Sequence, residues 1–96
     1  MRLTSFEIDT IKQVVHGLAP SAKVYLFGSR TDDAKRGGDI DLLVLGEIED
    51  AFHTRSRIWG ELQNRLWEQK IDVVVAKPDS EDPFVRYIYE EALELV

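Results

Sequence analysis

Residues 24–45 read VYLFGSRTDDAKRGGDIDLLVL, and this stretch decides how the rest of the chain is interpreted. Its first apolar run stops at Gly28, a loop follows, and its second apolar run begins with the carboxylates of Asp39 and Asp41. Because successive side chains of a strand alternate between faces, both carboxylates point to the same face of a sheet. Two negative charges placed so closely destabilise a strand unless water, a cation or a donor relieves them. The natural partner of this pair is a divalent metal ion.

The composition is that of an ordinary globular chain, and it limits the classes of function. With 96 residues the chain is long enough for one small core and too short for two, so we expect a single domain over residues 1–96. A net charge of -6 argues against sequence-independent binding of nucleic acid. There is no cysteine, no N-terminal signal segment and no apolar run near the roughly 20 residues that cross a bilayer. We expect a cytoplasmic protein with no direct nucleic-acid partner and no membrane contact.

Helices and strands alternate along the predicted chain, and each helix start carries a capping signal. Thr4 and Glu7 have the spacing of a capping box. Asp50 is placed to cap the second helix, and Asp82 followed by proline begins the third. The expected segments are a helix from Thr4 that Pro20 closes, strands at 23–27, 39–45 and 70–76, a helix over 50–68, and a helix from Phe84 to the C-terminus.

The second and third helices carry more apolar residues than one core stripe needs. For the second helix, we expect the core stripe to consist of Phe52, Trp59, Leu62 and Leu66. Ile58 and Trp67 widen that stripe, which suggests that part of it meets a partner. In the third helix, the residues expected to cover the sheet are Phe84, Val85, Ile88, Ala92 and Leu95, and those left over for another chain are Tyr87, Tyr89 and Val96.

Paired carboxylates at a strand start are suited to phosphoryl and nucleotidyl transfer, in which Mg²⁺ ions bridge phosphate oxygens. Mg²⁺ keeps waters and takes oxygens from the nucleotide, so two or three aspartates suffice. A calcium loop is excluded because Asp39-Ile40-Asp41 continues directly into an apolar strand, without the further ligands that an EF-hand needs. Taken alone, such a pair is more often a solvated strand end than a metal site.

The loop between the two apolar runs adds candidate phosphate contacts. A glycine at a strand end lets backbone N–H groups approach a phosphate, and a serine hydroxyl adds a donor, so Gly28 and Ser29 are candidates. A plain strand-ending turn is the alternative for an isolated Gly-Ser pair. Arg30 is the favoured phosphate contact among the basic residues, whereas Lys35 and Arg36 are explained equally well as solvated charges.

Asp72 is the third candidate carboxylate, because it is the only internal charge of the strand at 70–76. It could complete a metal site or accept the proton of an attacking hydroxyl, and its alternative role is a strand-end cap or an ion pair. A Ser-His-Asp triad is not expected, since Ser29 lacks a nucleophile elbow and neither His16 nor His53 has an orienting partner. Gly37 and Gly38 are assigned a structural role, in the bend that enters the second strand.

The segments LFGSR at 26–30 and GDIDLLV at 38–44 resemble the minimal nucleotidyltransferases of the DNA polymerase beta superfamily. The order of the predicted elements agrees with that family over nearly the whole chain. Two positions depart from many relatives, which have a small residue where this chain has Thr31 and a serine where it has Gly38. The resemblance implies an α/β (α+β) fold in which a small mixed β-sheet is flanked by helices.

The resemblance also implies roles for five residues. By position, Gly28 and Ser29 would contact the phosphates of the nucleotide, and Asp39 and Asp41 would bind Mg²⁺. The third carboxylate of the superfamily maps onto Asp72, which gives a candidate catalytic and metal-binding set of three aspartates.

Minimal members of this family are similar to the antitoxin half of two-gene modules whose other half is a HEPN-domain ribonuclease toxin. The resemblance implies that the chain moves AMP from ATP onto a tyrosine of such a toxin and silences it. Two alternatives stay open. The chain could neutralise a toxin by binding alone, or it could transfer a nucleotide to a nucleic-acid or small-molecule acceptor supplied by another chain.

Overall fold

The structure is a computed structural model that describes residues 2–32, 38–66 and 69–95. None of the helices in these ranges combines the length and the hydrophobicity that a membrane-spanning segment needs. The elements in chain order are α1 (Ser5–Leu18), β1 (Lys23–Phe27), a short 3-10 helix η1 (Gly28–Thr31), β2 (Ile40–Leu45), α2 (Ala51–Arg65), β3 (Ile71–Ala76), α3 (Pro83–Glu90) and β4 (Leu93–Glu94).

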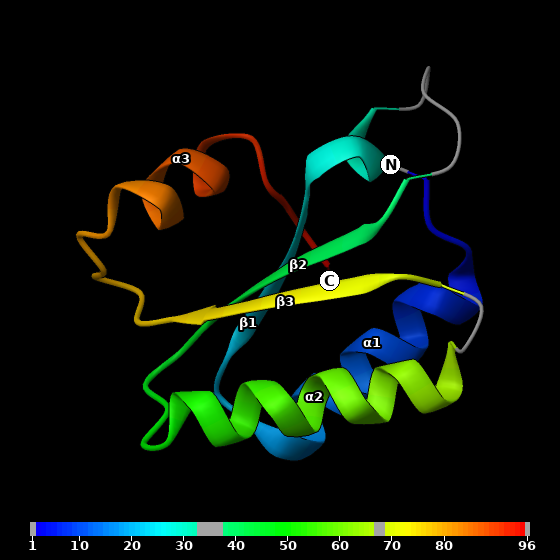
Figure 1. Cartoon of the computed structure of the whole chain (residues 1–96), viewed down its shortest axis with the longest axis horizontal. Helices are drawn as coiled ribbons and strands as arrows, with labels where there is room; N and C mark the ends of the chain where they lie inside the picture. The colour runs from blue at the N-terminus through cyan, green and yellow to red at the C-terminus, as the bar shows by residue number, and fades with distance from the viewer. Residues whose placement is uncertain (1, 33–37, 67–68, 96) are drawn as a thin grey trace.

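The four strands form one mixed sheet in the order β3-β2-β1-β4. β2 and β3 are parallel, whereas β1 is antiparallel to both β2 and β4. This arrangement confirms the predicted mixed sheet flanked by helices (Figure 1). The register pairs Asp41 of β2 with Phe27 of β1 on one side and with Asp72 of β3 on the other. One row of side chains therefore crosses the sheet from the end of β1 to the start of β3.

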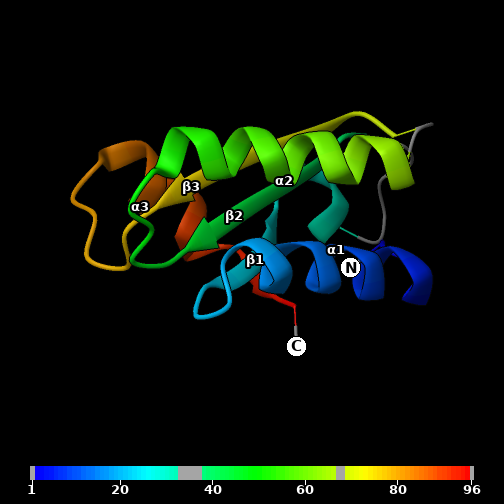
Figure 2. The ribbon, with the colours of Figure 1, turned by 90° about the horizontal axis from the view of Figure 1, so that it is seen from below.

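Helices α1 and α2 cover one face of the sheet and contact each other, as the view from below shows (Figure 2). Alternate residues of the central strands point into this layer, as the strand period of two requires. The largest side chains of this core are fully buried, among them Ile11 and Val15 of α1, Leu26, Ile40 and Leu42 of the sheet, and Ile58 and Leu62 of α2.

Helix α3 lies on the opposite face and covers only part of it. Val85 and Ile88 of this helix pack on Tyr25 and Leu43 of the sheet. The ring of Tyr25 also meets that of Tyr89 edge to face, with 5.3 Å between the ring centroids. The same face carries Asp41 and Asp72. Helix α3 leaves Asp41 half-buried and Asp72 exposed.

The helix starts agree with the predicted caps. The Thr4 hydroxyl accepts from the Glu7 backbone N–H at 3.0 Å, and the Glu7 carboxylate accepts from the Thr4 N–H at 2.8 Å. The side chain of Asp50 accepts from a backbone N–H of the first turn of α2 at 3.1 Å. Asp82 does the same for α3 at 2.9 Å, with proline at the first helical position.

The predicted helix from Phe84 was confirmed as far as Glu90, and its predicted extension to the C-terminus was wrong. α3 ends at Glu90, and the chain then forms β4, which adds a short edge strand to β1. Two consecutive acidic residues at the helix end oppose its dipole, which disfavours further helix there. Leu95, expected on the α3 side, is buried in the α1–α2 layer, and its backbone N–H donates to the Val24 carbonyl at 2.9 Å. Val96 lies outside the described residues.

The predicted core stripe of α2 was also partly wrong. Ile58, Leu62 and Leu66 are buried, whereas Phe52 is 75% exposed and Trp59 is 44% exposed. Helix α2 packs on both α1 and β3, so its Ile58 side faces inward. The side that carries Phe52 and Trp59 faces the sheet edge and solvent. Trp67 lies outside the described residues. In α3, Phe84 was likewise expected in the core and is 54% exposed.

Candidate functional site

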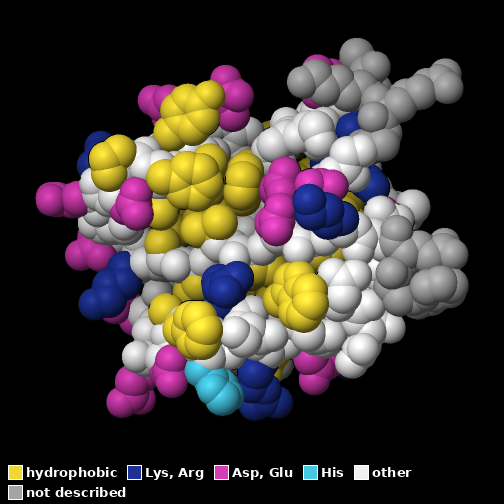
Figure 3. Space-filling model, viewed as in Figure 1, with side chains coloured by type: hydrophobic (Ala, Val, Ile, Leu, Met, Phe, Trp, Pro, Cys, Tyr) yellow, Lys and Arg dark blue, Asp and Glu magenta, His cyan; other side chains and the backbone are white. Residues whose placement is uncertain are grey.

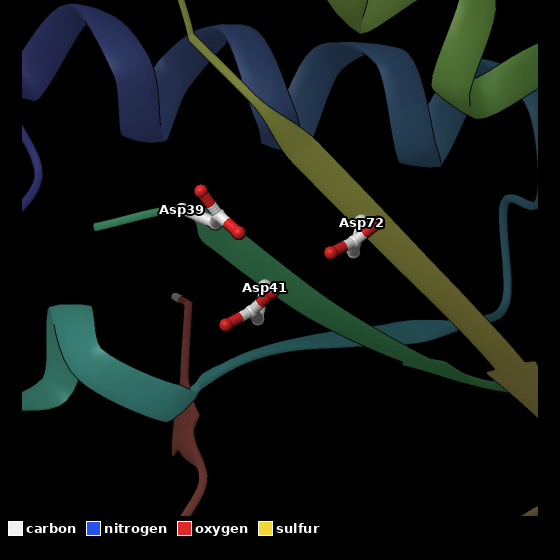
Figure 4. Close-up of side chains that lie close together, drawn as sticks. All are labelled: Asp39, Asp41 and Asp72. Atoms are coloured by element: carbon white, nitrogen blue, oxygen red, sulfur yellow. The ribbon is translucent and has the colours of Figure 1, made fainter.

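Three carboxylates meet where β2 and β3 begin. Asp39 immediately precedes β2, Asp41 is its second residue, and Asp72 is the second residue of β3. Because β2 and β3 are parallel and in register at Asp41 and Asp72, both strand starts lie at one end of the sheet. One carboxylate oxygen from each residue lies within 4.8 Å of the others. Figure 4 shows the three side chains on the same face of the sheet, which the strand alternation predicted for Asp39 and Asp41.

The charges of this cluster are poorly balanced. Burial raises the pKa of the Asp41 carboxyl above its ordinary value, and the negative charges of Asp72 and Asp39 raise it further. The Lys70 ammonium opposes this shift. It lies 3.6 Å from Asp39, in a solvent-exposed pair of the kind that contributes little to stability. Three oxygen donors at this spacing fit a hard divalent cation such as Mg²⁺, which would remove the repulsion.

Two glycines bring the loop after β1 against the carboxylates. Gly28 has a φ of 77°, and a Cβ at this position would collide with the carboxylate of Asp41. Gly38 has a φ of 90°, and a Cβ there would collide with the Ser29 hydroxyl. Both conformations are ones that glycine adopts readily and other residues rarely do. Gly38 therefore does more than bend the chain, because its missing side chain makes room for Ser29.

Arg30 holds this loop in place. Its Nε donates to the Gly38 carbonyl at 3.2 Å, its Nη1 to the Arg2 carbonyl at 2.9 Å, and its Nη2 to the Gln69 side-chain oxygen at 2.8 Å. The guanidinium of Arg2 in turn donates to the Ser29 carbonyl at 3.1 Å. All three guanidinium nitrogens of Arg30 thus have protein acceptors. A phosphate contact by Arg30 stays a prediction.

The structure assigns no place in this site to the remaining candidates of the sequence. Lys35, Arg36 and Gly37 are outside the described residues. His16 and His53 are exposed on α1 and α2, and neither belongs to the acidic cluster. The structure thus brings the three aspartates together and sets Gly28 and Ser29 beside them.

Two cavities flank Phe27, whose side chain lines both of them. One, of about 470 Å³, opens beside Gly28 and Ser29 and extends to Tyr87 of α3. The other, of about 540 Å³, lies over Asp41 and Asp72. Its remaining lining residues are Arg55, Trp59, Val73, Val74 and Phe84. Figure 3 shows acidic side chains between a hydrophobic group over α3 and further hydrophobic and basic side chains toward α2.

Sequence reasoning missed the aromatic and basic lining of the larger cavity. It placed Trp59 and Phe84 in the core and gave Arg55 no role. Arg55 and Trp59 belong to α2 and Phe84 to α3, and only the position of these helices beside β3 in the folded chain shows what the side chains face. A usable signal was the surplus of apolar residues on α2, which exceeds what one stripe can bury.

Comparisons with known proteins agree with this geometry. The family model described as polymerase beta nucleotidyltransferase matches residues 9–96. Among solved structures, a tri-AMPylated Shewanella oneidensis HEPN toxin in complex with its MNT antitoxin contains a similar chain, at a TM-score of 0.73 and 19% identity, over 98% of this chain and 72% of that one. A mutant of the toxin–antitoxin pair MntA-HpeT has the same TM-score and identity, over 93% of this chain and 71% of that one. No curated protein sequence matches.

Proposed function

This chain belongs to the polymerase beta nucleotidyltransferase family, and we propose that it transfers AMP from ATP to a tyrosine of a HEPN-domain toxin. The observation that carries the proposal is the cluster of three carboxylates within 4.8 Å, set against a glycine-bearing loop. The toxin partner is supported by the solved HEPN–MNT complexes whose fold this chain shares. We place the protein in the cytoplasm, where ATP and Mg²⁺ are abundant.

In this reaction Asp39 and Asp41 would hold Mg²⁺, and Asp72 would complete the site. When bound, Mg²⁺ supplies positive charge that neutralises the phosphate oxygens of ATP and stabilises the charge that develops during transfer. Burial and the negative charges of Asp72 and Asp39 raise the pKa of the Asp41 carboxyl, and the repulsion among these carboxylates favours binding of a cation.

Gly28 and Ser29 would bind the phosphates that leave, through backbone N–H groups and the serine hydroxyl. Arg30 and its hydrogen bonds hold that loop, so the donors are oriented before ATP arrives. We also propose that Arg30 contacts a phosphate directly. For this contact, its guanidinium would replace one of its present hydrogen bonds to protein oxygens by a hydrogen bond to the phosphate.

The transfer itself exchanges one bond to phosphorus for another. The acceptor hydroxyl oxygen forms a bond to the α-phosphorus, the bond from the α-phosphorus to the bridging oxygen breaks, and pyrophosphate leaves with that electron pair. The proton of the hydroxyl passes to the carboxylate of Asp72, which is exposed on the cavity side and can release it to solvent. The product is a phosphodiester between AMP and the acceptor.

The test is the transfer of label from ATP marked at its α-phosphate to a HEPN-domain toxin, for which the product of the adjacent gene is the first candidate to try. Asp39→Asn should abolish transfer while the protein stays folded, because it removes one charge that binds Mg²⁺. Asp9→Asn is the matched control, since this exposed aspartate lies on α1 outside the cluster, and it should transfer as the wild type does. Full transfer by Asp39→Asn would refute the proposal.

Neutralisation by binding alone is the second candidate. It is favoured by the exposed aromatic side chains on α3, of which Tyr87 is 75% exposed and Phe84 is 54% exposed. The same variant separates the two: if Asp39→Asn binds the toxin and still protects cells, binding is sufficient. If it binds the toxin and no longer protects, transfer is required.

A further inference from the structure

The register of the sheet fixes the order in which the site residues lie across the strands. Phe27, Asp41 and Asp72 are neighbours in one row across β1, β2 and β3. Gly28 follows Phe27 directly and packs against Asp41, so the loop that carries Ser29 lies at the β1 end of this row. Asp72 lies at the other end, on the edge strand. The candidate phosphate donors and the candidate base are therefore on opposite sides of Asp41.

In-line transfer requires the leaving phosphates and the attacking hydroxyl to lie on opposite sides, as the candidate phosphate donors and the candidate base do. The attacking oxygen and the leaving oxygen stand on opposite sides of the phosphorus. If Gly28 and Ser29 hold the leaving pyrophosphate, the acceptor has to approach from the Asp72 side. The ribose oxygen on the α-phosphorus does not lie on the line between the attacking and leaving oxygens. In-line geometry therefore does not fix where the base of the nucleotide lies.

The cavity on the Asp72 side has aromatic and cationic walls. Trp59 is held at the edge of the sheet, because its indole Nε1 donates to the Ile71 carbonyl at 3.0 Å. Arg55, one turn earlier on α2, lies with its guanidinium 5.7 Å from the centre of the Phe52 ring. Phe84, at the start of α3, lines the opposite wall and is more than half exposed. None of these side chains is needed to fill the core.

We propose that Arg55, Trp59 and Phe84 form the slot that receives the phenol ring of the acceptor tyrosine. The proposal rests on the proposed function, since it takes transfer to tyrosine as given. Aromatic walls favour a ring over an aliphatic hydroxyl. Arg55 forms no ion pair with any other described residue, so its charge is available to the ring face or to the phenol oxygen.

Kinetics of the two substrates test the slot. Arg55→Ala and Trp59→Leu should each raise the KM for the HEPN acceptor roughly tenfold, the effect of one lost aromatic or cation–π contact in a desolvated site. The affinity for α,β-methylene-ATP, measured by calorimetry with Mg²⁺, should not change. Arg57→Ala is the matched control, an exposed arginine on α2 that does not line the cavity, and it should leave both values unchanged.

Two outcomes would overturn the proposal. Loss of nucleotide affinity with an unchanged acceptor KM would mean that the slot holds the base of ATP. Unchanged values for both substrates in both variants would mean that the slot holds neither.

A cross-linking experiment separates this proposal from the proposed function. Trp59→p-benzoylphenylalanine should cross-link to the toxin segment that carries the acceptor tyrosine, and the same replacement of Arg57 should not. This result does not depend on catalysis, so a complex that cross-links but transfers no AMP refutes the proposed function and keeps the slot as a docking site. Transfer of AMP by the wild type, with no cross-link from position 59 or one to another part of the toxin, refutes the slot.

Discussion

Gly28→Ala is the substitution for which the structure makes the strongest prediction. The residue has a φ of 77°, where an L-residue with a Cβ costs about 1–2 kcal/mol. The added methyl group would also collide with the Asp41 carboxylate, and such overpacking costs about 1–3 kcal/mol. Together these effects predict a loss of at least about 2 kcal/mol, and a fall in Tm of at least about 8 °C for a chain of this size.

Thermal unfolding followed by circular dichroism, with and without Mg²⁺, measures this effect. The matched control is Gly60→Ala within α2, where a Cβ meets nothing within 4 Å. Since alanine is the better helix former by about 0.5–1 kcal/mol, the control should raise the Tm by a few degrees. The Mg²⁺-dependent rise in Tm should be lost in Gly28→Ala and kept in Gly60→Ala. A Gly28→Ala variant with wild-type Tm and a wild-type Mg²⁺ response would refute the close approach of this loop to Asp41.

Three further substitutions test separate parts of the structure. Asp41→Asn should raise the Tm of the metal-free protein at neutral pH, because it relieves the repulsion from Asp72 and Asp39, and it should abolish stabilisation by Mg²⁺. Since folding raises the pKa of the Asp41 carboxyl, the folded wild type binds more protons than the unfolded chain at pH values just above the ordinary pKa of aspartate. Its free energy of unfolding in urea should therefore rise as the pH falls through that range, and it should rise more steeply than that of Asp41→Asn. Arg30→Ala should lower the free energy of unfolding in urea by about 1–3 kcal/mol, because it removes three hydrogen bonds. An unchanged free energy of unfolding would contradict the role of Arg30 in holding the loop after β1. Asp82→Ala should cost about 1 kcal/mol through the lost cap of α3, and the adjacent exposed Glu81→Ala should cost nothing measurable.

Local rules predicted the parts of the fold that depend on neighbours in sequence. The caps at Thr4, Asp50 and Asp82 were confirmed because a cap involves only the residues of one helical turn. The Asp39 and Asp41 pair was placed correctly because alternation along one strand fixes its face. Asp72 was a candidate because it is the only internal charge of its strand, and the family resemblance supported it, but only the parallel pairing of β2 with β3 shows that it lies beside Asp41.

The parts that failed depend on contacts between distant segments. Apolar spacing cannot say which side of α2 faces the sheet, so Trp59 was expected in the core, although its indole N–H satisfies a carbonyl at the sheet edge. The C-terminal segment has helical periodicity, but Leu93 and Glu94 pair with β1 instead. The hydrogen bonds of Arg30 to Arg2 and Gln69 were not predicted, because they join segments that are distant in sequence, and its phosphate contact stays a prediction.

The most direct test of the central claim compares ATP labelled at the α-phosphate with ATP labelled at the γ-phosphate. Each is incubated with Mg²⁺, this chain and the proposed HEPN partner, and the label is located by gel and mass spectrometry. Nucleotidyl transfer predicts that the α-label appears on a tyrosine of the partner and that the γ-label is released in pyrophosphate. Transfer of the γ-label to the partner, or a partner without label in either reaction, would contradict it.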